Sequence, residues 1–253
     1  MQAKAIALLI DSDNCPAGSL KSILDELSKY GDITIRRAYG DWKNQSLNGW
    51  AGILHDHAIQ PVQQFAYTKG KNATDSAMII DAMDLLYTQK LVGVAIASSD
   101  SDFTPLAMRI RTNGIQVFGF GEKKTPQPFI NACSKFLFLE SLADEQTETS
   151  DVAPLRKRTT KELRGDTKLT NCLRSAVTAT SDEEGWSPLS AIGSHIVKND
   201  PAFDPRNYGY RKLSELVIAT ELFEMRKADM HYFLKAKKGK APLSPASKQN
   251  PQT

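Results

Sequence analysis

The sequence is poor in cysteine and histidine. Its 253 residues include three cysteines and four histidines, and the cysteines stand far apart, with no CxxC pair and no Cys/His cluster. A disulfide framework and a zinc site are therefore not expected. Long apolar runs are also lacking, because no stretch approaches the roughly 20 residues that cross a bilayer. The N-terminus passes directly into a predicted strand without a signal-peptide pattern, so we expect a cytoplasmic protein with no membrane contact.

Positive charge is in slight excess, and its distribution is uneven. The net charge is +3, and the whole excess lies after residue 140. It is concentrated near the C-terminus in five lysines with no acidic residue among them: Lys235, Lys237, Lys238, Lys240 and Lys248. A flexible tail of this composition is suited to contact polyanions, although solubility alone would also explain it.

Residues 1–140 alternate between apolar runs and helical spacing. The runs at 5–10, 33–38, 59–65, 91–96, 115–119 and 136–139 are predicted strands, and intervening segments such as 47–57 and 74–87 have the period of a helix. Alternation of this kind predicts a parallel sheet with right-handed crossovers. The fold class is therefore α/β, with helices covering the sheet.

Aspartates stand at the ends of two predicted strands and at the start of one helix. Asp11 and Asp13 end the first strand, Asp100 and Asp102 follow the fourth, and Asp75 lies in the first turn of the helix at 74–87. Ligands of open parallel sheets bind at the carboxyl ends of the strands, so these side chains are expected to lie close together. Helix capping explains one such aspartate, but acids from three segments favour a functional site.

Such a cluster needs neutralising charge. Two carboxylates 4 Å apart repel by about 4 kcal/mol at an effective dielectric constant of about 20, unless cations or protons are bound. Mg²⁺ or Mn²⁺ suits these oxygen ligands, and Mg²⁺ takes its remaining ligands from water and substrate phosphate. Metal activation of a water predicts hydrolysis of a phosphodiester. Asp81 lies about 120° around the helix from Asp75 and about 9 Å along it, so it is expected to have a structural or supporting role.

A second unit follows a polar segment. Residues 141–165 lack an apolar period and are a predicted linker. Residues 166–236 contain three predicted helices, the last over 206–220, and then a short hairpin over 222–234, which together suggest a winged helix-turn-helix. The Pro/Ser/Lys-rich residues 237–253 are a predicted disordered basic tail.

The first unit, 1–140, resembles the NYN domains, relatives of the PIN nucleases. The resemblance covers roughly Ala3 to Glu140 and depends on three motifs: Asp11-x-x-Asn14, Lys71-x-x-x-Asp75 and Ser99-Asp100-Ser101-Asp102-Phe103. It implies a PIN-like three-layer α/β/α fold and metal-dependent ribonuclease activity. It also implies a catalytic, metal-binding set of Asp11, Asp75, Asp100 and Asp102, with Asn14 in support. Asp13 stands at a more variable position and is predicted only to support the site.

The second unit resembles an OST-HTH domain, also called LOTUS. The strings GWSPLS at 185–190 and PxFDxRxYGxxKL at 201–213 carry this resemblance. It implies a winged-helix fold and binding of RNA, including G-rich RNA, although some relatives bind protein partners instead. Trp186, Phe203 and Leu213 are expected to pack the small core. The predicted RNA contacts are Arg206, Tyr208, Arg211 and Lys212, the three cations because they are expected to line a helix facing the ligand.

Together these features predict a metal-dependent endoribonuclease with an attached RNA-binding module, and the expected partner is RNA, single-stranded or G-rich. Lys69 and Lys71 flank the predicted site and are candidate phosphate contacts, although a solvated loop would carry the same residues. Two alternatives stay open. One is a noncatalytic RNA-binding or scaffold protein. The other is an aspartate-dependent phosphatase, for which Asp11-x-Asp13 is typical, but Cys15 stands where Thr or Val is expected.

Overall fold

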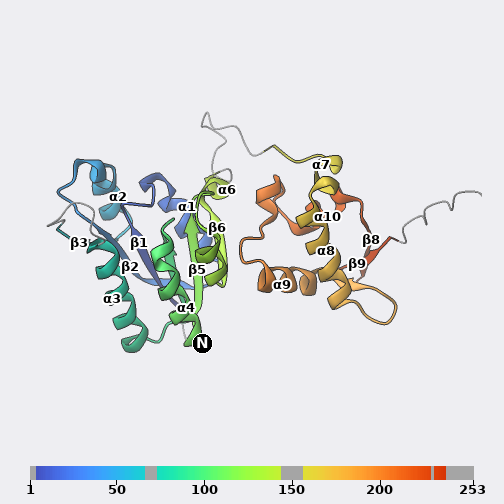
Figure 1. Ribbon diagram of the computed structural model, residues 1–253, viewed down its shortest axis with the longest axis horizontal. Coiled ribbons are helices and arrows are strands. Elements are labelled where there is room, and N and C mark those ends of the chain that lie inside the picture. The colour runs from blue at the N-terminus through green and yellow to red at the C-terminus, as the bar shows by residue number, and fades with distance from the viewer. Residues whose placement is uncertain (1–3, 66–72, 144–155, 229–230, 238–253) are drawn as a thin grey trace, which may run out of the picture.

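The computed structural model describes residues 4–65, 73–143, 156–228 and 231–237, which form a larger α/β unit followed by a smaller, mainly helical one (Figure 1). Within these ranges, no helix combines the length and apolar character needed to span a membrane.

The larger unit is built on one six-stranded sheet. Its strands are β1 (Ala5–Asp11), β2 (Asp32–Gly40), β3 (Gln60–Gln63), β4 (Gly93–Ala97), β5 (Gln116–Gly121) and β6 (Lys135–Phe138). They are ordered β3-β2-β1-β4-β5-β6, and each neighbouring pair is parallel, as the alternating sequence pattern predicts. The strand order reverses at β1, which pairs with both β2 and β4. A crevice therefore opens at the carboxyl ends of β1 and β4, where open parallel sheets bind ligands.

Helices cover both faces of this sheet, which makes the predicted three-layer α/β/α arrangement (Figure 1). One face packs against α1 (Leu20–Leu27), α2 (Ala51–Asp56) and α6 (Leu139–Ala143), and the other against α3 (Ala73–Thr88), α4 (Thr104–Thr112) and α5 (Gln127–Ala132). Three 3-10 turns precede helices: η1 (Ala17–Ser19), η2 (Gln45–Trp50) and η3 (Ser101–Phe103).

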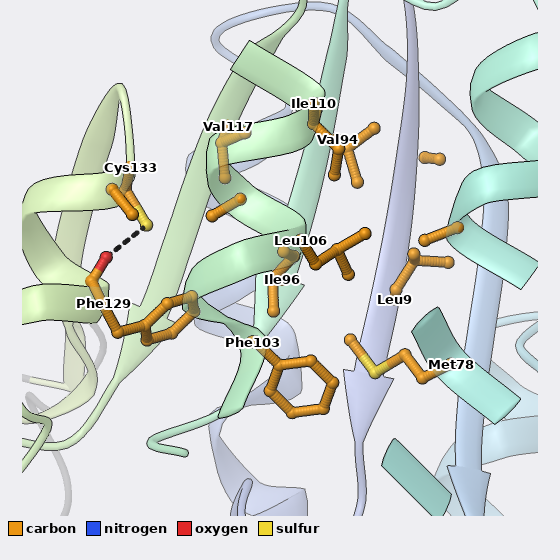
Figure 2. Packing of buried hydrophobic residues seen from close by; sticks show 14 of the residues in the cluster. Leu9, Met78, Val94, Ile96, Phe103, Leu106, Ile110, Val117, Phe129 and Cys133 are labelled. Atoms are coloured by element: carbon orange, nitrogen blue, oxygen red, sulfur yellow. Dashed lines mark hydrogen bonds between the residues drawn. The ribbon is translucent and has the colours of Figure 1, made fainter. Parts of the chain in front are cut away.

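Both faces of the central strands are buried because side chains alternate between two apolar layers. Leu9 of β1 and Ile96 of β4 point toward Met78 and Leu106 of the covering helices (Figure 2), whereas Leu8 contributes to the layer on the opposite face. Full burial of one such side chain contributes about 1.5–3 kcal/mol relative to exposure. The apolar runs that predicted the strands thus also bury both faces of the sheet whose edge carries the aspartates.

The smaller unit packs helices against a three-stranded antiparallel sheet, β7-β9-β8. Its elements are α7 (Thr160–Gly165), α8 (Thr167–Thr180), β7 (Ser187–Pro188), α9 (Leu189–Asn199), η4 (Pro205–Tyr208), α10 (Leu213–Thr220), β8 (Phe223–Ala228) and β9 (His231–Ala236). The predicted hairpin is confirmed as β8 and β9, and it lies beside helices as in a winged helix.

Two local predictions for this unit differ from the structure. The end of the predicted linker forms α7, because Thr159 and Glu162 make a capping box and Leu163 is buried in the small core. The helix predicted over 206–220 is divided into η4 and α10. Gly209 separates them at a φ of +83°, and a Cβ there would lie 2.7 Å from the Cα of Lys157.

The two units contact each other through the segment before and within η4. The backbone N–H of Phe136 in β6 donates to the carbonyl of Pro201 at 2.8 Å, and Ala202 packs against the apolar layer of the larger unit. Arg206 donates to Glu26 of α1 at 3.0 Å, and the two side chains are only 11% and 3% exposed. Burial would raise the pKa of Glu26, but hydrogen bonds from Arg206 and Lys29 lower it to about 2. The contact between the units therefore includes a buried ion pair.

Candidate active site

The candidate site lies at the carboxyl ends of β1 and β4, which are adjacent in the sheet. Asp11 is the last residue of β1, and the segment that follows β4 carries Ser98, Asp100 and Asp102. Asp75 reaches the same edge from the first turn of α3. The crevice at the reversal of strand order thus receives acids from three segments.

Asp11 is fully buried, and both of its carboxylate oxygens accept hydrogen bonds. One oxygen accepts from the backbone N–H groups of Asp13 and Asn14 at 3.1 and 3.3 Å. The other accepts from the side chains of Asn14 at 2.9 Å and Ser98 at 2.7 Å. Burial raises the pKa of Asp11 although the hydrogen bonds from Ser98 and Asn14 act to lower it. These contacts orient Asp11 firmly and leave it poorly placed to act as the nucleophile of a phosphatase.

Ser98 connects the ends of β1 and β4. Its hydroxyl donates to Asp11 and accepts from the backbone N–H of Asp100 at 3.0 Å. Asp100 in turn caps η3 by accepting from the backbone N–H of Asp102 at 2.9 Å. Asp100 is therefore a helix cap, which was the alternative to a functional role. The same cap places the Asp100 and Asp102 side chains next to each other.

Three carboxylates converge at this point. One oxygen from each of Asp75, Asp100 and Asp102 lies within 4.8 Å of the other two. Burial is the main cause that raises the pKa of Asp75 to about 6, and the charges of Asp11, Asp100 and Asp102 raise it further. The negative charges of these carboxylates are therefore concentrated at one point, where they would stabilise a bound cation.

These residues fit a divalent cation that prefers oxygen ligands, because three carboxylates at this separation provide hard oxygen donors. Asp75 and Asp102 also line a cleft of about 520 Å³ between α3 and α4. A second cleft, of about 350 Å³, is lined by Asp13 and Asn14 together with Glu122 and Lys124, and by none of the three converging acids. The acidic cluster itself therefore opens into the cleft between α3 and α4.

Other predicted site residues have different positions. Asp13 is exposed at the rim and donates its backbone N–H to Asp11. Asp81 bonds to Arg37 and Tyr39 of β2 and is not one of the three converging acids. Lys69 and Lys71 lie outside the described residues.

The structure corrects the geometry expected for the RNA contacts of the smaller unit. Arg206 and Tyr208 belong to η4, Arg211 to the following turn, and Lys212 to the cap of α10, so these residues do not line one helix. Arg206 donates to both carboxylate oxygens of Asp204 as well as to Glu26. Its guanidinium, predicted to bind phosphate, is instead held between carboxylates because the domain contact buries it.

Tyr208 also has a packing role, whereas its two cationic neighbours are open to solvent. The Tyr208 ring lies 6.2 Å from that of Phe203 and beneath the guanidinium of Arg158, at 5.0 Å. Arg211 and Lys212 are exposed. Of the four predicted RNA contacts, these two have the most accessible charge.

Ser98 was not predicted as a site residue, and Trp186 was predicted in a different environment. Ser98 bridges Asp11 and Asp100. The only local sign of this role was its position two residues before Asp100. Trp186, expected in the small core, lies outside its apolar cluster, which does include Phe203 and, at its edge, Leu213.

Comparison with known proteins matches both units to families. Residues 5–140 match the NYN domain, and residues 164–231 match the OST-HTH/LOTUS domain. An uncharacterized protein of Methanocaldococcus jannaschii is 31% identical over 122 residues, covering 46% of this chain and 47% of that protein. The chain thus spans about half the length of this relative.

Two solved structures align with parts of the chain. A protein of unknown function from Vibrio parahaemolyticus has 18% identity and a TM-score of 0.44, covering 54% of this chain and 94% of that one. A Chromobacterium violaceum protein, solved by NMR, has 26% identity and a TM-score of 0.26, covering 39% and 100%. NYN domains are PIN-like nuclease domains, and OST-HTH/LOTUS domains are RNA-binding modules. Because the NYN match takes in more than half of its residues, this chain belongs to the NYN domain family, and an OST-HTH/LOTUS domain follows its NYN domain.

Proposed function

We propose that this protein is a divalent-metal-dependent endoribonuclease that hydrolyses RNA phosphodiesters. The observation that carries the proposal is the convergence of Asp75, Asp100 and Asp102 at the reversal of strand order, with oxygens within 4.8 Å of one another. Membership of the NYN family, and an RNA-binding module in the same chain, support RNA as the substrate.

Asp75, Asp100 and Asp102 would hold Mg²⁺ or Mn²⁺. When bound, such an ion activates a water and stabilises the charge that develops on the scissile phosphate. Asp11 completes the acidic set in this proposal, and its part is to fix the ends of β1 and β4 through Ser98 while adding negative charge behind the ligands. Without metal, the raised pKa of Asp75 lets that carboxyl take up a proton and reduces the repulsion.

The cleft between α3 and α4, which Asp75 and Asp102 line, provides room for a strand to pass across the site. A second cleft is lined by Asp13 and Asn14, whose backbone N–H groups bond to Asp11, and its Lys124 is paired with Glu122. A substrate that passes across the site can be cut internally, which is why the proposal is an endonuclease. Lys69, Lys71, Arg211 and Lys212 are the phosphate contacts we propose.

A circular single-stranded RNA tests both the chemistry and the mode of cutting. We expect the purified full-length chain to linearise it with Mg²⁺ or Mn²⁺ and to leave it intact in EDTA. Asp100→Asn should reduce the rate by about a hundredfold or more, because metal ions supply several kcal/mol of transition-state stabilisation. Asp84→Asn, an exposed substitution on α3, is the matched control and should cleave normally.

Three other results would each contradict a different part of the proposal. Shortening of linear RNA while circular RNA stays intact would indicate an exonuclease. Equal rates for wild type and Asp100→Asn would place the activity elsewhere or in a contaminant. RNA binding without cleavage under any metal condition would favour the noncatalytic alternative.

A further inference from the structure

The outer face of the small sheet carries aromatic and cationic side chains together. In the antiparallel register, Arg226 of β8 lies opposite Phe233 of β9, and Glu224 lies opposite Lys235. Met225 and Leu234, which alternate with them, face the core. Side chains on successive strand positions point to opposite faces, so Arg226, Phe233 and Lys235 share the outer one.

Trp186 joins this face from the residue before β7. The guanidinium carbon of Arg226 lies 4.3 Å from the centroid of its ring and 5.4 Å from that of Phe233. The ammonium of Lys235 lies 5.6 Å from the Trp186 ring. Neither Trp186 nor Phe233 belongs to the apolar cluster of the small core or to the residues packed against it. We call Trp186, Arg226, Phe233 and Lys235 the wing face.

The position of Trp186 is fixed by a tight turn. Its backbone N–H donates to the side chain of Asp182 at 2.8 Å, and Asp182 donates its own N–H to the carbonyl of Trp186 at 2.9 Å. Gly185 takes the left-handed conformation that this turn requires, with a φ of +83°. The indole is therefore held on the outside of the sheet by the backbone, without help from core packing.

We propose that the wing face binds unpaired RNA bases by stacking, an inference that rests on the RNA-binding part of the proposed function. Unpaired bases stack on aromatic side chains and on arginine guanidinium planes, and cations beside them contact the backbone. Here a guanidinium lies over two rings, so a cationic and aromatic platform is already assembled before RNA arrives. Arg226 and Trp186 provide the stacking surfaces, and Lys235 contacts phosphate.

The two strands that carry the platform have more cations than acids. The exposed Lys237 follows Lys235, whereas Lys227 lies opposite Tyr232 on the other side of the sheet, 5.9 Å over that exposed ring. The acidic neighbours are Glu224, opposite Lys235, and the exposed Asp182, Glu183 and Glu184 in the turn before Trp186. Cations predominate on the strands themselves, and the removal of the Glu224 charge should strengthen RNA binding.

The wing face is remote from the other unit. In Figure 1, β8 and β9 lie at the end of the smaller unit that points away from the six-stranded sheet, whereas η4 belongs to the contact between the units. RNA held at the wing face therefore does not compete with the domain contact. The charge that a stacked strand needs comes from residues other than the buried Arg206.

The test compares binding of a single-stranded RNA with binding of an abasic oligomer of equal length and phosphate number, in EDTA so that no cleavage occurs. We expect wild type to bind the abasic oligomer more weakly. Trp186→Ala should weaken binding of normal RNA by about fivefold to a hundredfold, the range that stacking on one aromatic side chain supplies, and should leave abasic binding nearly unchanged. Arg226→Lys, which keeps the charge, should also reduce the difference between the two oligomers.

Tyr87→Ala is the matched control, because Tyr87 is 63% exposed and lies under Arg109 in the NYN domain. It should bind like wild type, and Glu224→Gln should bind RNA more tightly. Thermal unfolding of each variant verifies the fold, and Arg226→Lys still tests stacking if Trp186→Ala unfolds. Equal binding of normal and abasic RNA by wild type, or an unchanged preference in both wing-face variants, would overturn the proposal.

Cleavage at saturating RNA separates this inference from the proposed nuclease activity. Wing-face variants should cleave at the wild-type rate once RNA is saturating. A wild type that prefers normal RNA to abasic RNA but never cleaves would refute the nuclease proposal alone. A wild type that cleaves RNA without this preference would refute the wing-face proposal alone.

Discussion

Replacement of Asp75 by asparagine should stabilise the metal-free protein near neutral pH. In the folded protein, burial and neighbouring acids raise the pKa of Asp75 from 3.8 to about 6. A difference of about two pH units between folded and unfolded pKa values corresponds to about 3 kcal/mol. Asp75 is only partly buried, so solvent screening reduces this, and we expect Asp75→Asn to gain about 1–2 kcal/mol.

The sign of the pH dependence follows from proton binding. Because the folded-state pKa lies above the unfolded one, the folded protein binds this proton more tightly. Its contribution to stability is fully present below about pH 4, falls as the pH rises through about 6, and is absent above that. The gain from Asp75→Asn should therefore appear at about pH 7.5 and vanish at about pH 4, where the wild-type carboxyl is already protonated.

Urea unfolding of the full-length chain in EDTA at these two pH values measures the effect, with Asp84→Asn on the same helix as control. Added Mg²⁺ provides a second reading. A ligand at about 100 times its Kd stabilises a protein by about 2.7 kcal/mol, and this gain should be much smaller in Asp75→Asn than in wild type. Equal stability of Asp75→Asn and wild type at both pH values, or an undiminished response to Mg²⁺, would refute the reasoning.

Three further perturbations address the hydroxyl bridge, the buried ion pair and the smaller domain. Ser98→Ala removes a buried hydroxyl that bonds both strand ends, so it should destabilise the protein by about 1–3 kcal/mol and weaken metal binding measured by calorimetry. Glu26→Ala or Arg206→Ala should each destabilise the protein by about 1.5–3 kcal/mol, because each removes a charge-assisted hydrogen bond between the units while Lys29 still pairs with Glu26 and Asp204 with Arg206. A double-mutant cycle should show coupling between the two residues. Deletion of residues 156–253 should weaken RNA binding. It should also make the slope of log affinity against log salt shallower, by about 0.7 for each phosphate that these residues bind. The cleavage rate at saturating RNA should stay near that of the full-length chain.

Local sequence patterns were sufficient for most of the secondary structure of the larger unit, and they pointed to the acids that lie together at one edge of its sheet. Apolar runs and helical periods depend on near neighbours in the chain, and they predicted the alternation that the sheet confirms. Because strands alternating with helices run parallel, the placement of Asp11 and Asp100 after strands also implied that they share one edge. The structure does bring Asp75, Asp100 and Asp102 together.

The order of the strands was decided by tertiary packing. The sequence shows six strands but not that β1 lies between β2 and β4, which is what brings Asp11 within reach of Ser98, 87 residues away. Such pairings depend on how the apolar faces of distant segments bury one another. No local pattern contains that information, so the hydroxyl bridge was visible only in three dimensions.

The sequence determined the residue types of the smaller domain, and its fold determined which of them meet. The chain shows that Arg206 is cationic and Trp186 aromatic, from which phosphate binding and core packing were the natural expectations. The structure gives both residues a different environment, since Arg206 is buried against Glu26, 180 residues away, and Trp186 lies outside the core under Arg226. The environment of a side chain depends on the residues that pack against it. Here those residues are distant in the sequence, and only folding brings them together.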